Sequence, residues 1–329
     1  MTTEKRKVWV DQLRGFCMIA ILWFHTEMYY AGTDITPYAF YVGDVLAVFF
    51  FLSGYLFWNG QPVNLKHKLF SIWRWLLIPY FVFTTLLAIP KALVHQDYEG
   101  WQPIVFDIMS GNASWFIATL IVSQLFFTLA LHITRGQAKW LVPLSLLMLL
   151  ASHFIGNGCH PSPLFYEQNL WHVNEAFLAF FLLTLGYYYH QYEDCFSWQQ
   201  KSIAPFLLVL CFVGLKIIIL QGSMKLILGP ILVSDYPVFI IDLIISILLL
   251  TAVFKRIPRL KVLSWTGRHS IVYYFICGGV PLVTAMLFNR MNLPYTSFMR
   301  LLLAFVVVYS LSTLVVWIVY RYTNIVHNA

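Results

Sequence analysis

Three ionisable residues, Asp11, Arg14 and His25, lie within the otherwise apolar stretch 8–30. Arg14 and His25 are eleven residues apart, and three turns of an α-helix advance about 10.8 residues, so the two side chains share one face of a helix. Asp11 lies one turn before Arg14 on that face. An ionised side chain inside a membrane costs at least about 2.5 kcal/mol and usually faces a cavity lined by protein. This face is therefore a candidate functional site.

Distances along the helix decide which of these groups can act together. At about 1.5 Å per residue, Arg14 and His25 lie about 16 Å apart, and Asp11 and His25 about 21 Å apart. Asp11 can therefore pair with Arg14, whereas an orienting partner for His25 must come from another helix. If the helix begins at Val8, His25 lies about 26 Å into a core of about 30 Å. One helix thus offers a cation near one membrane face and a titratable base near the other.

The composition places the chain in a membrane. Of its 329 residues, 60% are hydrophobic and only 11% are charged, against about 25% charged in soluble domains. The net charge of +7 is small and the basic residues do not cluster on one amphipathic face, so no nucleic-acid partner is expected. The five cysteines show no CxxC spacing, and the histidines His153, His160 and His172 lack the spacing of zinc ligands, so no metal is expected.

We predict an all-α integral membrane protein, a bundle of about ten transmembrane helices that forms a single domain over residues 1–329. Most of the apolar stretches are near twenty residues, the length of one bilayer crossing. The predicted spans are 8–30, 38–59, 69–90, 113–133, 139–156, 174–190, 202–221, 236–254, 267–288 and 299–320. We assign Lys5, Arg6 and Lys7 to the cytoplasm. An even number of spans then places both termini in the cytoplasm, and it places most of the other basic residues on the cytoplasmic side of the membrane as well.

Five motifs in this order resemble the membrane-bound acyltransferase-3 family and together cover nearly the whole chain. They are Asp11-x-x-Arg14-Gly15 with His25, Phe49-Phe50-Phe51-Leu52-Ser53-Gly54, Arg74-Trp75-Leu76-Leu77-Ile78-Pro79-Tyr80, Ser114-Trp115-Phe116, and Gly267-Arg268-His269-Ser270 followed by Tyr274. The first motif combined with the second is the most specific. Two positions depart from the family pattern, because Cys277 stands where members often have a histidine and Ser71 where many have a second arginine.

The resemblance implies a transmembrane O-acyltransferase. It would move an acyl group, most often acetyl, from cytoplasmic acyl-coenzyme A (acetyl-CoA) to a hydroxyl of a sugar or of a lipid-linked or extracytoplasmic glycan. It also implies a multi-pass plasma-membrane protein, in the inner membrane of a bacterium, with membrane lipids around it. Association with a second copy of the chain is left open.

The resemblance also suggests roles for the residues of the first helix and of the cytoplasmic corner. An imidazole is largely neutral near pH 7, so His25 is the expected general base, which takes the proton of the acceptor hydroxyl. Arg14 would contact donor phosphates with Asp11 as its positioner; alternatively the two merely neutralise each other, or Arg14 snorkels toward the cytoplasm. Arg74, with Lys68 as its nearest cation, would bind the donor, although positive-inside topology alone predicts basic residues there.

The acceptor would approach from the outer side, where Asn112, Trp115 and Glu175 are predicted to lie. Trp115 could stack on a sugar, and Glu175 could orient His25 or hold the acceptor. Plain interfacial residues are the alternative reading for all three. Within the predicted spans, Lys216 and Asp242 have no partner that the sequence identifies.

A second class of function uses the same buried polar residues differently. A transporter or exporter of a glycan or small acid could use them as a relay. Transporters usually show repeats or helices interrupted at matching places in two halves, and the sequence reveals neither. A third interpretation is a binding or sensing domain that has this fold but does not catalyse acyl transfer. Cys277, which departs from the family pattern, is consistent with this interpretation.

Overall fold

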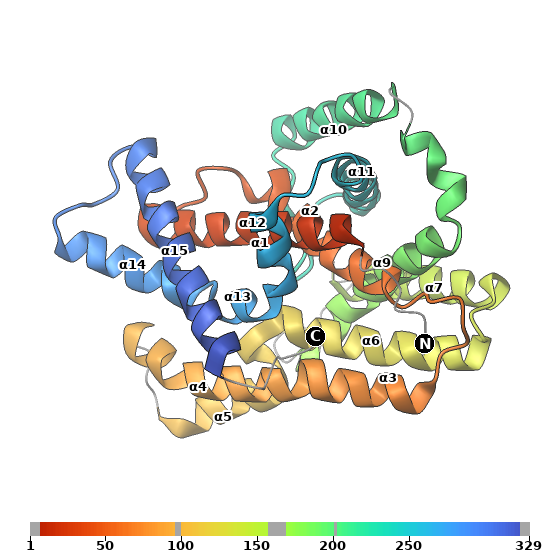
Figure 1. Ribbon diagram of the computed structural model, residues 1–329, viewed down its shortest axis with the longest axis horizontal. Coiled ribbons are helices and arrows are strands. Elements are labelled where there is room, and N and C mark those ends of the chain that lie inside the picture. Colours follow the sequence, from red (N-terminus) through yellow and green to blue (C-terminus); the bar gives the residue numbers. More distant parts are fainter. Residues whose placement is uncertain (1–6, 96–99, 157–168, 201–202, 323–329) are drawn as a thin grey trace. The chain divides into compact units, whose positions relative to one another are not determined.

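The computed structural model describes residues 7–95, 100–156, 169–200 and 203–322 (Figure 1). Helices occupy nearly all of these residues, and the strands within them are the short antiparallel pair β1 (Leu226–Ile227) and β2 (Leu232–Val233). The predicted all-α class is thereby confirmed. The basic residues Lys5 and Arg6, and the histidine His160, lie outside the described residues.

The number of spans agrees closely with the prediction. Among the described residues, eight helices are long and apolar enough to cross a membrane, so the chain is a multi-pass membrane protein. Two further helices, α13 (Ser270–Ile276) and α14 (Gly279–Arg290), are apolar enough only as a pair, and they are bent by 48° at a short break; counted as one span, they bring the number to nine. The helix that carries His25, α1 (Val8–Thr26), has 19 residues, several of them polar; it corresponds to the first predicted span, 8–30, and is not among these eight.

The break between α13 and α14 corrects one expectation, because stretch 267–288 was predicted as one continuous helix. The two residues between the helices are Cys277 and Gly278, with Pro281 three residues further on. Glycine weakens a helix and proline lacks the amide hydrogen that continues one, so the sequence carries a signal for this break.

The chain forms two units that interleave along the sequence, and each is described by itself. Unit 1 comprises residues 1–49, 198–223 and 240–329, and unit 2 comprises residues 50–197 and 224–239. Two helices contribute to both units, namely α2 (Tyr38–Tyr55) and α11 (Tyr236–Phe254).

Besides these, unit 1 contains α1, a π-helical turn η1 (Glu27–Ala31), α10 (Ile203–Gln221), α12 (Lys261–Arg268), α13, α14 and α15 (Phe298–Tyr322). Unit 2 contains α3 (Leu65–Ile72), a second π-helical turn η2 (Trp73–Leu77), α4 (Ile78–His95), α5 (Trp101–Ser110), the 3₁₀ turn η3 (Asn112–Ser114), α6 (Trp115–Thr134), α7 (Ala138–Gly156), the 3₁₀ turn η4 (Leu170–His172), α9 (Val173–Gln191), the strand pair and most of η5 (Glu193–Gln200).

Helices α1 and α12 pack closely in unit 1, and two glycines allow it. A Cβ atom added at Gly15 would lie 2.0 Å from the carbonyl oxygen of Leu263, and one added at Gly267 would lie 1.8 Å from that of Asp11. Small residues commonly permit such close helix contacts in membranes. The Gln12 side chain strengthens the contact, because its Oε1 accepts a hydrogen bond of 2.8 Å from the amide of Leu260, where α12 begins.

Replacing Gly267 with alanine is expected to destabilise the protein, because the added methyl group meets backbone of α1 rather than a movable side chain. Overpacking of this kind costs about 1–3 kcal/mol. The thermal unfolding midpoint of Gly267→Ala in detergent should therefore fall. Gly214→Ala in α10 is the matched control, since its Cβ would meet nothing within 4 Å and alanine favours the helix. Equal midpoints for the two variants would contradict the close contact.

Candidate active site

Helix α1 carries Asp11, Arg14 and His25, as predicted. Asp11 is buried, and its Oδ2 lies 3.9 Å from Nε of Arg268 on α12, whereas Arg14 and His25 are half-buried. Arg268 belongs to the motif Gly267-Arg268-His269-Ser270, in which the sequence analysis gave it no role of its own. The structure thus gives Asp11 a cationic partner that sequence reasoning missed, and this ion pair reinforces the α1–α12 contact.

The ring of His25 lies among aromatic side chains near the end of α1. It stacks on Tyr29 with a centroid distance of 6.1 Å and an interplanar angle of 16°, and the ring of Phe24 lies 5.6 Å away. The Tyr29 hydroxyl in turn lies 3.6 Å from the position of a Cβ added at Gly278, at the break between α13 and α14. Cys277, the position that departs from the family pattern, is buried beside Gly278. Tyr29 was not predicted, although it follows His25 by one helical turn.

The π-helical turn η1 begins two residues after His25 and is held from two sides. Glu27 is fully buried, and its Oε1 accepts hydrogen bonds from the amide of Thr36 at 3.2 Å and from its hydroxyl at 3.0 Å. Tyr30 donates a hydrogen bond of 2.8 Å to the carbonyl of Leu293. π-helical turns are rare and frequently occur at functional sites. The end of α1 that carries the candidate base is therefore fixed by side chains that sequence reasoning did not identify.

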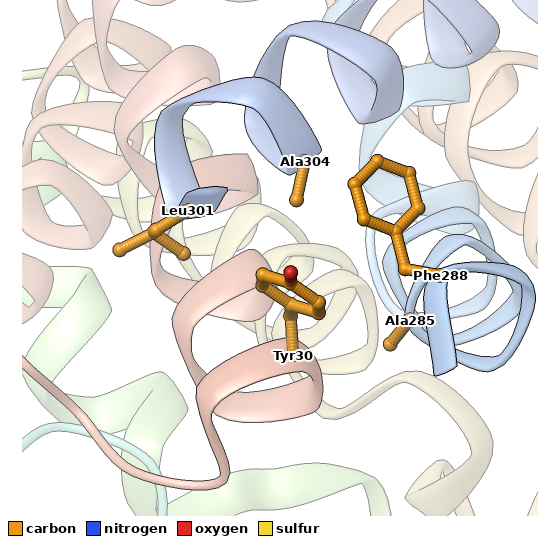
Figure 2. Close-up of a cluster of buried hydrophobic side chains, with 5 residues drawn as sticks. All are labelled: Tyr30, Ala285, Phe288, Leu301 and Ala304. Carbon is orange, nitrogen blue, oxygen red and sulfur yellow. The ribbon is translucent and has the colours of Figure 1, made fainter. Parts of the chain in front are cut away.

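Figure 2 shows how Tyr30 is packed in unit 1. Its ring faces a buried apolar cluster contributed by α14 and α15. The other members of this cluster are Ala285, Phe288, Leu301 and Ala304. The Tyr30 ring meets that of Phe288 edge to face at 5.4 Å. This packing anchors the turn after His25 to two helices from the end of the chain.

In unit 2, the predicted donor-binding residues lie on or near the second π-helical turn. Arg74 is exposed within η2, and its guanidinium lies 5.0 Å from the ring centroid of Trp75. Lys68 on α3 is half-buried, with its ammonium 4.0 Å from the ring centroid of Phe57. Such cation–π contacts hold a cation without neutralising it. Both groups therefore keep a charge with which an anionic donor could pair.

The predicted acceptor residue Glu175 begins a dense polar cluster at the start of α9 in unit 2. It is 1% exposed, and its Oε2 accepts a hydrogen bond of 2.6 Å from the Asn169 side chain. The same oxygen lies 3.5 Å from Nδ1 of His172, whose ring lies 6.3 Å from that of Trp115. The structure therefore brings Trp115 and Glu175 together through His172. Asn112 is exposed in the turn η3 that precedes Trp115.

Several polar atoms of this cluster are buried without a hydrogen-bond partner among the described residues. They are Oε1 of Glu175, Oδ1 of Asn174 and Nε2 of His172. Buried polar atoms are nearly always hydrogen-bonded, and leaving one unpaired costs about 1–3 kcal/mol. These atoms can therefore be satisfied by hydroxyl groups or water.

The backbone beside this cluster is strained. Trp171 and His172 both adopt left-handed conformations, with φ of 55° and 52°. Such conformations are uncommon outside glycine and cost about 1–3 kcal/mol each, and they concentrate at functional sites. The ring of Trp171 packs 5.3 Å from that of Tyr80. The sequence analysis considered His172 only as a possible zinc ligand; the signal that could have revealed this cluster was the run of polar residues between Asn169 and Glu175.

Comparison with known proteins identifies the family. The model of the acyltransferase-3 family, described as an acyltransferase domain, matches residues 7–321. The chain belongs to this family. No match was found among curated proteins or among solved structures. The family model spans residues of both units, and membership of the family implies an acyl donor and an acceptor.

Proposed function

We propose that this membrane acyltransferase moves an acyl group, most simply acetyl, from cytoplasmic acyl-CoA to a hydroxyl group of a sugar or glycan that is lipid-linked or extracytoplasmic. The observation that carries the proposal is the placement of Arg14 and His25 on α1, with the turn after His25 fixed by Glu27 and Tyr30. A base needs a defined position to abstract a proton, and buried hydrogen bonds provide one. We assign the protein to the bacterial inner membrane.

The reaction that we propose for His25 is general-base catalysis. The imidazole takes the proton of the acceptor hydroxyl while the hydroxyl oxygen attacks the thioester carbonyl carbon. The carbon–sulfur bond then breaks, and the imidazolium returns its proton to the departing thiolate of coenzyme A. The ester and the free thiol are the products, and the histidine ends in its starting state.

We assign the donor phosphates to the cationic groups. Arg14 and Arg74 can each form charge-assisted, bidentate hydrogen bonds with phosphate oxygens, and Lys68 adds a further positive charge. Asp11 would hold the position of α1 through Arg268, whose Nε lies 3.9 Å away. Arg14 would therefore bind the donor phosphates from a fixed position, because its helix α1 is held against α12.

For the acceptor we assign the polar cluster of unit 2. Oε1 of Glu175 and Oδ1 of Asn174 are acceptors without a partner among the described residues, which suits the hydroxyl donors of a sugar. The half-buried ring of Trp115 offers an apolar face of the kind that packs against the C–H groups of a pyranose. Asn112, exposed just before Trp115, could add a hydrogen bond at the rim.

The experiment that tests the proposed chemistry measures coenzyme A thiol released from acetyl-CoA by the purified protein. Thiol release above that of a detergent blank is the expected result, because an acyltransferase hydrolyses its donor slowly when water replaces the acceptor. The rival function, a transporter of a glycan or small acid, predicts substrate flux in vesicles without thiol release. That outcome would overturn the proposal.

Replacing Arg14 with glutamine should weaken acetyl-CoA binding, because the charge-assisted hydrogen bonds to phosphate are lost. Such bonds contribute about 1.5–3 kcal/mol, so KM for acetyl-CoA is expected to rise about 10- to 100-fold with a smaller change in kcat. Arg290→Gln, an exposed arginine at the end of α14, serves as the control. An unchanged KM in a well-folded Arg14→Gln protein would remove the assignment.

A further inference from the structure

A buried cluster of three charged side chains lies in unit 1 on helices α2, α10 and α11. Nζ of Lys216 lies 2.7 Å from Oδ2 of Asp44 and 2.7 Å from Oδ2 of Asp242. It also donates a hydrogen bond of 3.0 Å to the backbone carbonyl of Ala39. Asp242 accepts a hydrogen bond from this ammonium, whereas Oδ2 of Asp44 makes an ion pair with it and no hydrogen bond.

The cluster is removed from water. The exposed fractions of Asp44, Lys216 and Asp242 are 4%, 2% and 2%. All three helices are candidate membrane spans, and both aspartates lie about two turns after the first residue of their helix. The ring of Phe212 lies 5.2 Å from the ammonium. An uncompensated charge at this place would be expensive.

The charges of the three groups do not balance if every group is ionised. One ammonium faces two carboxylates, which leaves one net negative charge in apolar surroundings. Both carboxylates approach the same nitrogen, so they also repel each other at short range. Two carboxylates that share a site normally hold one proton between them. One added proton makes the cluster neutral.

A second observation indicates where this proton can lie. Oδ1 of Asp242 and Oδ2 of Asp44 are buried without a hydrogen-bond partner among the described residues, and so is the hydroxyl of Ser246, one turn after Asp242 on α11. A protonated carboxyl group is a hydrogen-bond donor, whereas a carboxylate can only accept. The polar and titratable groups around the cluster from the packed helices are Cys17 on α1, Asp44 on α2, Lys216 on α10, and Asp242 and Ser246 on α11.

We propose that Asp44, Lys216 and Asp242 form an intramembrane proton-binding site, which holds one proton between its two carboxyl groups and is neutral in that state. The site is separate from the residues assigned to acyl transfer. Its ligand is a hydrogen ion rather than a metal, because the lysine ammonium already occupies the position between the carboxylates. Loss of the proton would place a net charge between α2 and α11, the two helices that contribute to both units.

Counting charges in variants tests the proposal. Asp44→Asn and Asp242→Asn each leave one carboxylate facing Lys216, so each is neutral without a bound proton. Both should unfold in detergent at a temperature close to that of the unmodified protein. The double variant Asp44→Asn/Asp242→Asn leaves Lys216 without a counter-charge and should unfold at a much lower temperature than either single variant. A double variant as stable as the single variants would overturn the proposal, and so would two single variants as unstable as the double.

Infrared difference spectroscopy tests for the proton itself. The purified protein should show the C=O stretch of a protonated carboxylic acid that shifts in D₂O. This band should be lost in both single variants, because the remaining carboxyl group is ionised in each. Asp34→Asn, at an exposed loop aspartate, is the control and should leave the band in place. Retention of the full band in both single variants would overturn the proposal.

Discussion

The His25→Ala variant is expected to lose about 10²- to 10⁴-fold in the rate of acyl transfer, the range that general-base catalysis typically contributes. The physical reason is that Asp11 and Arg14 lie several turns away on α1, and the nearby carboxyl group of Glu27 is engaged by Thr36. Transfer is measured as coenzyme A released by the purified protein in the presence of membranes that contain the acceptor.

The controls for this variant separate chemistry from folding. His132→Ala removes an exposed histidine from the last turn of another span, α6, and should retain full activity. The unfolding temperature of His25→Ala should stay near that of the unmodified protein, because its ring is only half-buried. A well-folded His25→Ala protein that still transfers acyl groups at the normal rate would refute the catalytic assignment.

The Glu175→Gln variant is expected to use its acceptor about 10- to 100-fold less efficiently. Glutamine keeps the shape of the side chain but replaces charge-assisted hydrogen bonds, each of about 1.5–3 kcal/mol, with neutral ones. Acylation of surface glycan in cells should fall accordingly, whereas slow hydrolysis of acetyl-CoA by the purified variant should persist. This split would assign Glu175 to the acceptor rather than to the donor.

The exposed Asp194 in unit 2 provides the matched control, because Asp194→Asn removes the same charge outside the cluster. Unchanged glycan acylation in Glu175→Gln cells would mean that the polar cluster does not bind the acceptor. Equal losses of donor hydrolysis and glycan acylation would assign the residue a general structural role instead.

The sequence predicts the spans well because bilayer thickness fixes their length and composition. It predicts their interruptions less well. The bend at Cys277 and Gly278 was not predicted although Gly278 and Pro281 signal it, whereas no comparable signal marks the π-helical turns η1 and η2. A broken span also occurs in transporters, but the described residues show no second bent pair to match it.

Apart from Trp115 and Glu175, which the sequence placed together on the outer side, the candidate site was predictable where its residues share one helix. Spacing alone places Asp11, Arg14 and His25 on α1. The partners that hold these residues come from distant positions, such as Arg268 for Asp11, and no local pattern encodes that pairing. The same is true of Lys216, whose partners Asp44 and Asp242 lie on two other helices. Glu27 and His172 were present as polar residues near the predicted site, but only the folded chain shows what they bind.

The most direct measurement is the mass of the surface glycan from cells that produce the unmodified protein, the His25→Ala variant or neither. Our account predicts that the glycan of cells with the unmodified protein is heavier by one acyl group, and that the other two glycans are identical. If all three glycans have the same mass, or if His25→Ala yields the acylated glycan in full amount, base-catalysed transfer to an extracytoplasmic hydroxyl is contradicted.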